Sequence, residues 1–278
     1  MKIVQISDTH VSHRGGPTTE NFRRLAEHLN EVVRPDLIVN SGDVVVIHPD
    51  NTNDRAHARE LHNALIAPLL VVPGNHDVGE PGTSPWAGLA VTDERVAAFE
   101  ATWGPGHWRH DLDGVILLGI NSELFGSGLE REALQWRWLE NTVAELPAGV
   151  PVLLFLHKPV WTVVEGPTEH QFDIGSASGE RLLGLFAETN LRAVGSGHLH
   201  RYRQKRRGTV TEVWAPSTAF VSEDDLGLPE GRDEVGYIEY VVEGGEVTAT
   251  YRSVPEMVKV TPYEVPDVTD MIAALSTP

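Results

Sequence analysis

Five short clusters of aspartate, histidine and asparagine each follow an apolar run that is long enough to form a strand. In chain order they contain Asp8 and His10; Asp43; Asn75 and His76; His157; and His198 and His200. Residues two apart in an extended chain point to the same side, so the Asp-x-His and His-x-His pairs can each face one centre. Imidazole together with carboxylate suits Zn²⁺, Mn²⁺ or Fe²⁺, whereas Mg²⁺ and Ca²⁺ prefer oxygen ligands. The clusters therefore predict a transition-metal site.

The number of candidate ligands indicates more than one metal ion. They exceed the four ligands of one tetrahedral site, and they are enough for two ions about 3.5–4 Å apart if one carboxylate bridges. Taken singly, each residue also has a structural explanation, because Gly42-Asp43 can form a turn and His157 can be an ordinary loop histidine. The metal site is favoured because all five clusters end apolar strands and have glycine or small neighbours.

Alternating strands and helices position these clusters. Apolar runs predict strands at 2–7, 36–40, 69–72, 115–120, 152–156 and 192–195, and helical periodicity predicts helices at 18–33, 54–66, 93–102, 130–146 and 180–189. In open α/β sheets, ligands bind at the carboxyl ends of the strands, which is where the five clusters lie. The stretches 79–92 and 166–179 are predicted to be loops.

The pattern changes at about residue 208. Strands are predicted at 210–214, 237–242 and 247–251, and the last two form a hairpin across Glu243-Gly244-Gly245. A proline-containing tail follows, with a short helix that Asp267 can cap. We therefore predict an α/β domain over residues 1–254 and a C-terminal extension, 255–278, that packs on this domain or on an oligomer partner.

The composition argues against several classes of protein. The 278 residues include 41% hydrophobic and 22% charged residues, which indicates a globular chain with a substantial core. The formal net charge of −18 disfavours nucleic acid and anionic membranes as partners and suits cations. The absence of cysteine excludes disulfides and thiolate ligands. The sequence shows neither a signal peptide nor an apolar run of membrane-spanning length, so we predict a cytoplasmic protein.

The five clusters resemble, in order, the five motifs of the calcineurin-like metallophosphoesterases. The matching stretches are Asp8-Thr9-His10, Gly42-Asp43, Gly74-Asn75-His76-Asp77, His157 and Gly197-His198-Leu199-His200. The resemblance runs from residue 3 to about residue 220. It implies a layered α/β fold, in which a β-sandwich is flanked by helices and carries the metal site at the carboxyl ends of its strands. It also implies a cofactor of two divalent metal ions, Mn²⁺, Fe²⁺ or Zn²⁺.

The resemblance assigns a role to each motif residue. One metal ion would be held by Asp8, His10, Asp43 and His200, and the other by Asp43, Asn75, His157 and His198, with Asp43 as the bridge. His76 would be the catalytic histidine, which stabilises or protonates the leaving group while a metal-bridging hydroxide attacks phosphorus. Asp77 would either support a neighbouring loop or histidine, or only shape its own turn.

The resemblance includes features of both phosphodiesterases and phosphatases, so it does not identify the class of ester that is hydrolysed. Cyclic-nucleotide and glycerophosphodiester phosphodiesterases of this superfamily usually continue Asn-His-Asp with an acidic and then a basic residue, whereas this chain has Val78-Gly79. Residues 74–79, 99, 103–104, 121–123 and 135–139 are similar to calcineurin-like phosphatases that act on phosphoserine and phosphothreonine. The phosphatases proper have an Asp-Arg phosphate clamp soon after Gly-Asp, but here Val44-Val45-Val46-Ile47 follows.

We therefore predict an enzyme that hydrolyses small phosphodiesters or phosphomonoesters. The alternatives are a phosphoserine/phosphothreonine protein phosphatase, a 3′,5′-cyclic nucleotide phosphodiesterase, a nuclease and a metal-binding scaffold without turnover. The acidic composition disfavours the nuclease. The complete set of motif residues disfavours the scaffold. A homo-oligomer is left open.

Two further residues are candidate contacts for the substrate. His13 follows the first motif and Arg201 follows the last, although a surface histidine and a solvated strand edge at 201–207 are the simpler interpretations. The loop 161–178, with Trp161, His170 and Phe172, can line the pocket and carry selectivity, or it can form an oligomer contact.

Overall fold

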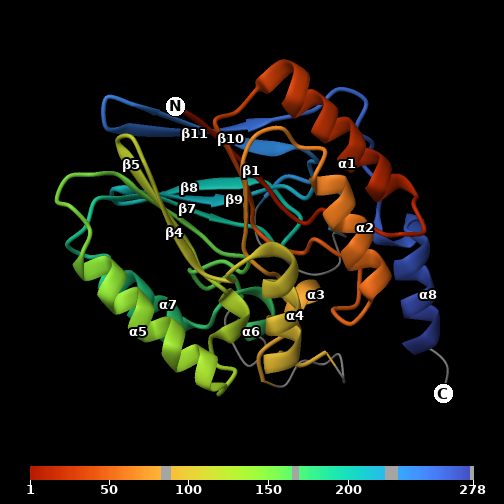
Figure 1. Ribbon diagram of the computed structural model, residues 1–278, viewed down its shortest axis with the longest axis horizontal. Coiled ribbons are helices and arrows are strands. Elements are labelled where there is room, and N and C mark those ends of the chain that lie inside the picture. Colours follow the sequence, from red (N-terminus) through yellow and green to blue (C-terminus); the bar gives the residue numbers. More distant parts are fainter. Residues whose placement is uncertain (83–88, 165–168, 223–230, 276–278) are drawn as a thin grey trace.

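Two stacked β-sheets form the centre of the computed structural model, and helices cover their outer faces (Figure 1). The structure describes residues 1–82, 89–164, 169–222 and 231–275. The predicted layered α/β fold, a β-sandwich flanked by helices, is confirmed.

The strands divide into a five-stranded and a six-stranded sheet. The first sheet has the order β11 (Glu246–Arg252), β10 (Tyr237–Glu243), β1 (Lys2–Ile6), β2 (Leu37–Asn40) and β3 (Leu69–Val71). The second has the order β4 (Trp108–Leu112), β5 (Val115–Gly119), β6 (Val152–Phe155), β7 (Leu191–Ser196), β9 (Val210–Trp214) and β8 (Arg203–Arg207). Strands β1, β2 and β3 are parallel neighbours, as are β6 and β7. Their carboxyl ends therefore meet at one edge of each sheet.

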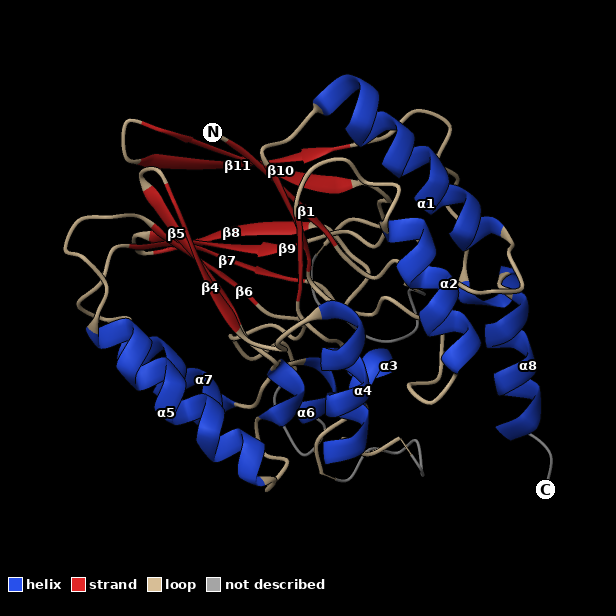
Figure 2. Cartoon of the chain, viewed as in Figure 1, coloured by secondary structure: helices blue, strands red, loops and turns tan. Residues whose placement is uncertain are grey.

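Helices pack on the outside of both sheets, as Figure 2 shows. The long helices are α1 (Pro17–His28), α2 (Thr52–His62) and α4 (Asp93–Trp103) against the first sheet, and α5 (Glu130–Ala144) and α7 (Ser176–Leu185) against the second. The other helical segments among the described residues are α3 (Asn75–Val78), α6 (Glu169–Phe172), α8 (Pro266–Leu275), a π-helical turn at Leu29–Val33 and 3-10 turns at Ser122–Leu124 and Pro262–Glu264.

Successive residues of the central strands point to opposite faces, and both faces are buried. On β1 and β2, Ile3 and Leu37 belong to the core between the sheets, whereas Val4 and Ile38 belong to the core under α1 and α2. Phe155 of β6 lies in the same core as Ile3. The central strands have few polar positions because neither face meets water.

A buried glutamine ties the end of β1 to the second sheet. Gln5 donates from Nε2 to Ser41 Oγ at 2.8 Å and to Ser196 O, on β7, at 3.3 Å. Its Oε1 accepts a hydrogen bond of 2.7 Å from the Tyr240 hydroxyl. A Cβ at Gly195 would lie 2.4 Å from Gln5 Oε1, so glycine is required where the sheets approach. These contacts bring the carboxyl ends of β1 and β7 together.

The structure corrects several predicted boundaries. The predicted loop 166–179 is wrong in part, since it contains α6 and the first residues of α7, and the helix predicted at 180–189 begins at Ser176 and ends at Leu185. The helix predicted at 54–66 begins at Thr52, where Asn51 accepts from two backbone amides, and it ends at His62. In the predicted loop 79–92, residues 83–88 lie outside the described part of the chain.

Strand β4 has no counterpart among the predicted strands, whereas β8 confirms the solvated strand edge expected at 201–207. Both strands lie at the edges of the second sheet. Their sequences are mostly polar, Trp-Arg-His-Asp-Leu in β4 and Arg-Gln-Lys-Arg-Arg in β8. Edge strands carry charged residues that protect their unpaired edge, so they lack the apolar pattern of a central strand. Pairing with a neighbour, rather than their own composition, makes them strands.

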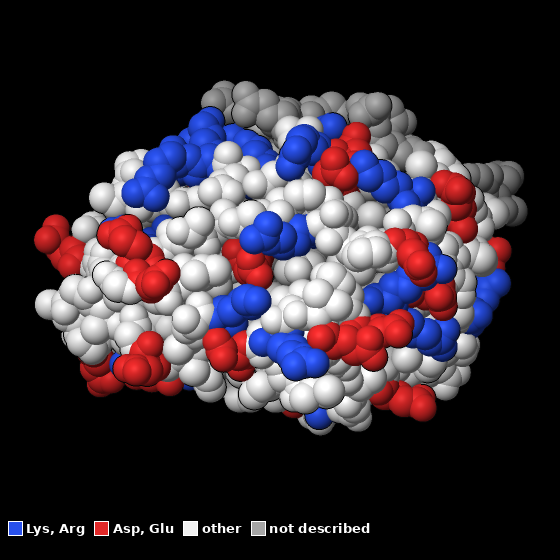
Figure 3. Space-filling view, turned by 90° about the horizontal axis from the view of Figure 1, so that it is seen from above, with Lys and Arg blue, Asp and Glu red and all other residues white. Residues whose placement is uncertain are grey.

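The basic run of β8 has its own counter-ion. Arg203 and Arg207 lie 3.9 and 2.9 Å from the carboxylate of the buried Glu212 on β9. They also lie over the rings of Trp214 and Trp161. On the face shown in Figure 3, acidic and basic side chains are interspersed, and basic side chains gather along one margin. These contacts fit an edge strand better than a cationic surface for nucleic acid.

His62 on α2 is a buried histidine outside the predicted site. Its Nδ1 donates to Ala58 O at 2.8 Å, and its Nε2 accepts from Asn40 Nδ2 at 3.1 Å. Its ring packs against Phe22 and Trp103. Burial lowers the pKa of His62 from 6.5 to about 4. Folding therefore favours the neutral ring over the charged one.

We expect His62 to make the metal-stripped protein less stable in acid. Between pH 6.5 and 4 the unfolded chain binds the proton that folded His62 excludes, so stability falls as pH falls. The expected loss from pH 7 to pH 5 is about 2 kcal/mol. Urea unfolding of the wild type and of His62→Gln at both pH values measures it, because glutamine can still accept from Asn40 but does not titrate. Equal losses in the two proteins would contradict the assignment.

Candidate metal centre

The five predicted clusters meet between the two sheets. Asp8 and His10 follow β1, Asp43 follows β2, Asn75 and His76 begin α3 after β3, His157 follows β6, and His198 and His200 follow β7. Backbone hydrogen bonds join the loops after β1 and β2, since Asp8 N donates to Gly42 O at 2.9 Å and His10 N donates to Asp43 O at 3.0 Å. The amide of His198 donates to both oxygens of the Asp8 carboxylate at 3.1 Å.

Unusual backbone conformations concentrate at these loops. Five of the seven non-glycine residues with positive φ in the described part of the chain belong to the predicted site: Asp8, His10, Asp43, His198 and His200, with φ between 41° and 69°. A non-glycine residue in this left-handed region costs of order 1–3 kcal/mol, and such residues cluster at functional sites.

Two glycines allow the loops to approach closely. A Cβ at Gly197 would lie 1.9 Å from Ser7 Oγ and 2.4 Å from Asp8 Oδ2. A Cβ at Gly74 would lie 2.3 Å from Asp43 Oδ1. Any side chain at these positions would displace a carboxylate of the site.

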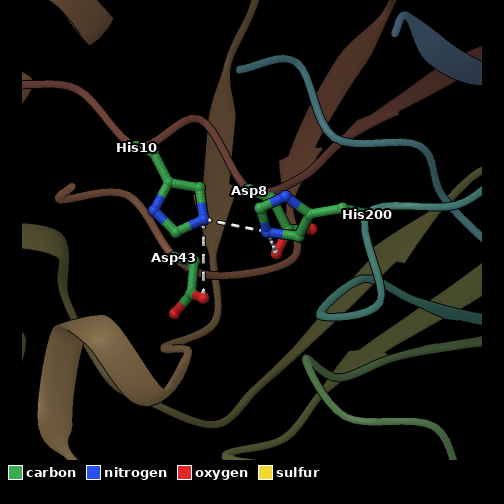
Figure 4. A group of neighbouring side chains, drawn as sticks. All are labelled: Asp8, His10, Asp43 and His200. Carbon is green, nitrogen blue, oxygen red and sulfur yellow. Dashed lines mark hydrogen bonds and ion pairs between the residues drawn. The ribbon is translucent and has the colours of Figure 1, made fainter. Parts of the chain in front are cut away.

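The first donor group consists of Asp8, His10, Asp43 and His200, all of them buried, with one ligand atom from each within 4.8 Å of the others. The ring nitrogens His10 Nε2 and His200 Nε2 are 3.0 Å apart. Asp43 Oδ2 lies 3.7 Å from His10 Nε2, and Asp8 Oδ1 lies 3.3 Å from His200 Nε2. Figure 4 shows the four side chains converging on one space.

The second donor group shares Asp43 with the first. It contains Asp43, His157 and His198, again within 4.8 Å of one another. His157 Nε2 lies 3.2 Å from Asp43 Oδ2, 3.2 Å from His198 Nδ1 and 3.0 Å from Asn75 Oδ1. One carboxylate therefore stands between two sets of nitrogen and oxygen donors.

Backbone carbonyls orient the imidazole rings. Nδ1 of His10, His157 and His200 lies 2.9–3.0 Å from the carbonyl oxygens of Val46, Ser41 and Phe220. Since a carbonyl only accepts, these Nδ1 atoms carry a proton and each Nε2 faces the group, where its unprotonated form can bind a metal ion. His198 is reversed, because its Nε2 faces Gln171 O at 2.5 Å and its Nδ1 faces His157. The arrangement fits two divalent cations of the kind that bind imidazole and carboxylate.

The ionisation states suit metal binding. Burial raises the pKa of Asp8 and Asp43, but nearby histidines outweigh this effect, lowering the pKa of Asp8 to about 2 and that of Asp43 well below 3.8. Burial lowers the pKa of His10 to about 3 and that of His198 well below 6.5. His157 differs, since Asp43 outweighs burial and raises its pKa to about 10. A cation bound there would have to displace this proton.

His76 lies beside the donor groups rather than in them. Its backbone N donates to Asp43 Oδ1 at 2.8 Å, and its Nδ1 donates to Ile47 O at 2.8 Å. Its ring stands edge-on to His10, with centroids 4.9 Å apart, and its Nε2 is 3.9 Å from Asp43 Oδ2. The side chain is 24% exposed, so a ligand from solvent can reach it.

Asp77 supports a neighbouring loop and also closes its own turn. Its buried carboxylate accepts from the amides of Val44 and Val45, at 3.0 and 3.2 Å, and from Gly74 N at 2.9 Å. It thereby joins the loop of Asp43 to the turn that presents Asn75. Asp77 therefore fulfils both roles considered from the sequence, since it supports a neighbouring loop and shapes its own turn.

Sequence reasoning missed three buried charged residues around the second donor group. Glu80 Oε1 accepts from Asn75 Nδ2 at 3.2 Å, which leaves Asn75 Oδ1 facing His157. Lys158 and Glu123 form a fully buried ion pair of 3.4 Å next to His157. A lysine directly after the histidine of a strand end was the available signal, since lysine is almost never fully buried without a partner.

The predicted substrate contacts lie outside both donor groups, and each has an acidic partner. His13 places its backbone N and its Nδ1 on Asp54 Oδ1, at 2.8 and 2.6 Å. Arg201 Nε lies 2.9 Å from Asp233 Oδ1. In the loop 161–178, Gln171 supplies the carbonyl that orients His198, while residues 165–168 and the side chain of His170 lie outside the described part of the chain.

Comparison with known proteins agrees with this geometry. The family model described as calcineurin-like phosphoesterase matches residues 1–202. Serine/threonine-protein phosphatase CPPED1 from Bos taurus is 27% identical over 87% of this chain and 77% of its own length. A probable cyclic nucleotide phosphodiesterase from Synechococcus sp. is 30% identical over 83% of this chain and 85% of its own length.

The fold also occurs among solved structures. The purple acid phosphatase PPD1 from yellow lupin seeds superposes with a TM-score of 0.70 over 94% of this chain, at 14% sequence identity. This chain spans 52% of that protein, about half its length. The likeness shows a common fold. Within the described residues, none of the helices combines the length and apolar character that a membrane span requires.

Proposed function

Because the chain belongs to the calcineurin-like phosphoesterase family, we propose that it hydrolyses phosphate esters at a centre of two divalent metal ions. The observation that carries this proposal is the position of Asp43, whose buried carboxylate is shared by two groups of donors. A shared carboxylate is what holds two ions at the short separation that two-metal hydrolysis uses.

The residues of the two donor groups are proposed as the ligands. The first ion is assigned to Asp8, His10, Asp43 and His200, and the second to Asp43, Asn75, His157 and His198. Mn²⁺, Fe²⁺ and Zn²⁺ are the candidate ions, because the donors mix imidazole nitrogen with carboxylate and amide oxygen.

The proposed chemistry divides between the ions and His76. Two bound divalent ions would lower the pKa of a shared water and neutralise charge on the phosphoryl oxygens. The Nδ1 proton of His76 is held by the carbonyl of Ile47, so its Nε2 is the atom that can exchange a proton with a substrate. We assign His76 to protonating the leaving oxygen from Nε2.

The proposed substrate is a small phosphate ester. The relatives include both a phosphatase and a phosphodiesterase, which supports phosphate esters as a class. A protein phosphatase is the second candidate, because the CPPED1 similarity extends over 87% of the chain. A cytoplasmic location stays a prediction of the sequence, and the oligomeric state stays open.

A panel of esters tests the proposal and separates its branches. The metal-stripped protein is reloaded with Mn²⁺ or Zn²⁺ and assayed with bis-p-nitrophenyl phosphate, p-nitrophenyl phosphate, 3′,5′-cyclic AMP and a phosphoserine peptide. We expect turnover of a synthetic ester only after reloading, because the two divalent ions would supply the positive charge that activates water and stabilises the transition state. Turnover of the peptide and monoester alone would favour the protein phosphatase.

The stripped protein is the matched control for each ester, and metal content is measured in the same samples. Equal turnover before and after stripping would contradict a metal-dependent enzyme. Two bound ions without turnover of any of the four esters would contradict hydrolysis and favour the metal-binding scaffold.

A further inference from the structure

The C-terminal segment, which is the described part of the predicted C-terminal extension (residues 255–275), packs behind the first donor group. Val260, Val265 and Val268 form one buried cluster with Val46, Ala219 and Phe220, and Ile47 and Met271 pack against it; we call these eight residues the C-terminal layer. Helix α8 carries two of them, Val268 and Met271, and Figure 1 shows it at the opposite end of the chain from β1. The layer therefore joins residues from three distant parts of the sequence.

Two residues of this layer orient the histidines of the first donor group. Val46 supplies the carbonyl at 3.0 Å from His10 Nδ1, and Phe220 supplies the carbonyl at 2.9 Å from His200 Nδ1. The Phe220 ring also lies against both imidazoles, with centroid distances of 4.8 Å to His10 and 4.5 Å to His200. The layer thus sets both the protonated nitrogen and the tilt of each ring.

Polar contacts anchor the segment to the same region. Val221 N donates to Val260 O at 3.0 Å, next to Phe220. The fully buried Asn21 on α1 donates from Nδ2 to Ala219 O and Val258 O, at 3.1 and 2.9 Å, and accepts from Val258 N at 3.0 Å. Removing apolar volume from the segment is therefore expected to shift Ala219 and Phe220, which it holds.

The second donor group has different supports. The carbonyls that orient its histidines belong to Ser41, at the end of β2, and to Gln171 in α6. Neither residue belongs to the C-terminal layer. The first donor group is therefore expected to depend more on the C-terminal segment than the second donor group does.

We propose that the C-terminal segment, through Val265 and Val268, is a positioning element that sets the metal affinity of the first site and leaves the second site unaffected. The inference rests on the proposed two-metal function. It predicts one weakened binding step out of two, whereas a purely structural role predicts that both steps change together or neither does.

The test is metal titration of the full chain with Val265→Ala and Val268→Ala combined, and with Val268→Ala alone as the milder variant. Metal-stripped protein is titrated with Mn²⁺ by calorimetry. We expect one of the two steps to weaken by at least about tenfold in the double variant, the scale measured when groups that orient ligands are lost. The other step should keep its affinity.

Val143→Ala on α5 is the control, because it removes the same two methyl groups from a buried helical valine in the core under the second sheet. It should leave both binding steps unchanged. His200→Ala identifies the affected site, since adding Val268→Ala to it should not weaken the remaining step. Weakening of that remaining step, equal weakening of both steps, or no change in the double variant would overturn the proposal. Fewer than two binding steps in the wild type would instead contradict the proposed function.

Discussion

Asp43→Asn is expected to leave the protein unable to hold two metal ions and to remove most of its activity. The Asp43 carboxylate lies 3.2 Å from His157 Nε2 and 3.7 Å from His10 Nε2, and among the described residues it alone belongs to both donor groups. Asparagine has the same shape but lacks the charge and one of the two oxygens. The loss of several kcal/mol of electrostatic stabilisation corresponds to a fall in turnover on the order of a thousandfold.

Metal content per chain and kcat/KM with the ester identified by the panel measure this result. Asp111→Asn is the matched control, because Asp111 lies on β4, is 55% exposed and pairs with Arg109. It should keep both metals and full activity. Retention of two metals and normal turnover in Asp43→Asn would show that Asp43 does not bridge.

His76→Ala is expected to keep both metal ions and to lose turnover by roughly a hundredfold or more, as general acids do when removed. His76 belongs to neither donor group, and its contacts with Asp43 and Ile47 leave Nε2 as the atom available to a substrate. An alkyl leaving group needs a proton more than p-nitrophenolate does, so the loss should be greater with an alkyl phosphate ester.

Comparing the two leaving groups separates a proton donor from other roles. Equal losses with both esters would argue that His76 only stabilises charge, and a parallel loss of metal would make it a ligand. His57→Ala is the matched control, since His57 lies on α2 with 23% of its side chain exposed, close to the 24% of His76, and pairs with Glu60. It should leave turnover unchanged.

Much of the architecture followed from local pattern. The apolar runs of β1, β2, β5 and β6 predicted strands, because central strands buried on both faces have few polar positions. Apolar runs did not predict strands β4 and β8, because an edge strand forms by pairing with its neighbour and needs no apolar run of its own. The sequence pattern also did not predict the first residues of α7, since Ser176 and Gly179 in its first turn have low helix propensity.

The types of the donors and their places at strand ends were determined by the sequence alone, because they depend on neighbouring residues. Their distances and protonated nitrogens were decided by the tertiary structure. His157 takes its orientation from Ser41, 116 residues away in the chain, and His10 meets His200 across 190 residues. The reversed ring of His198, the left-handed backbone at five site residues and the support from Phe220 follow from such distant contacts. Local sequence pattern carries no information about them, since they exist only once the two sheets have packed together.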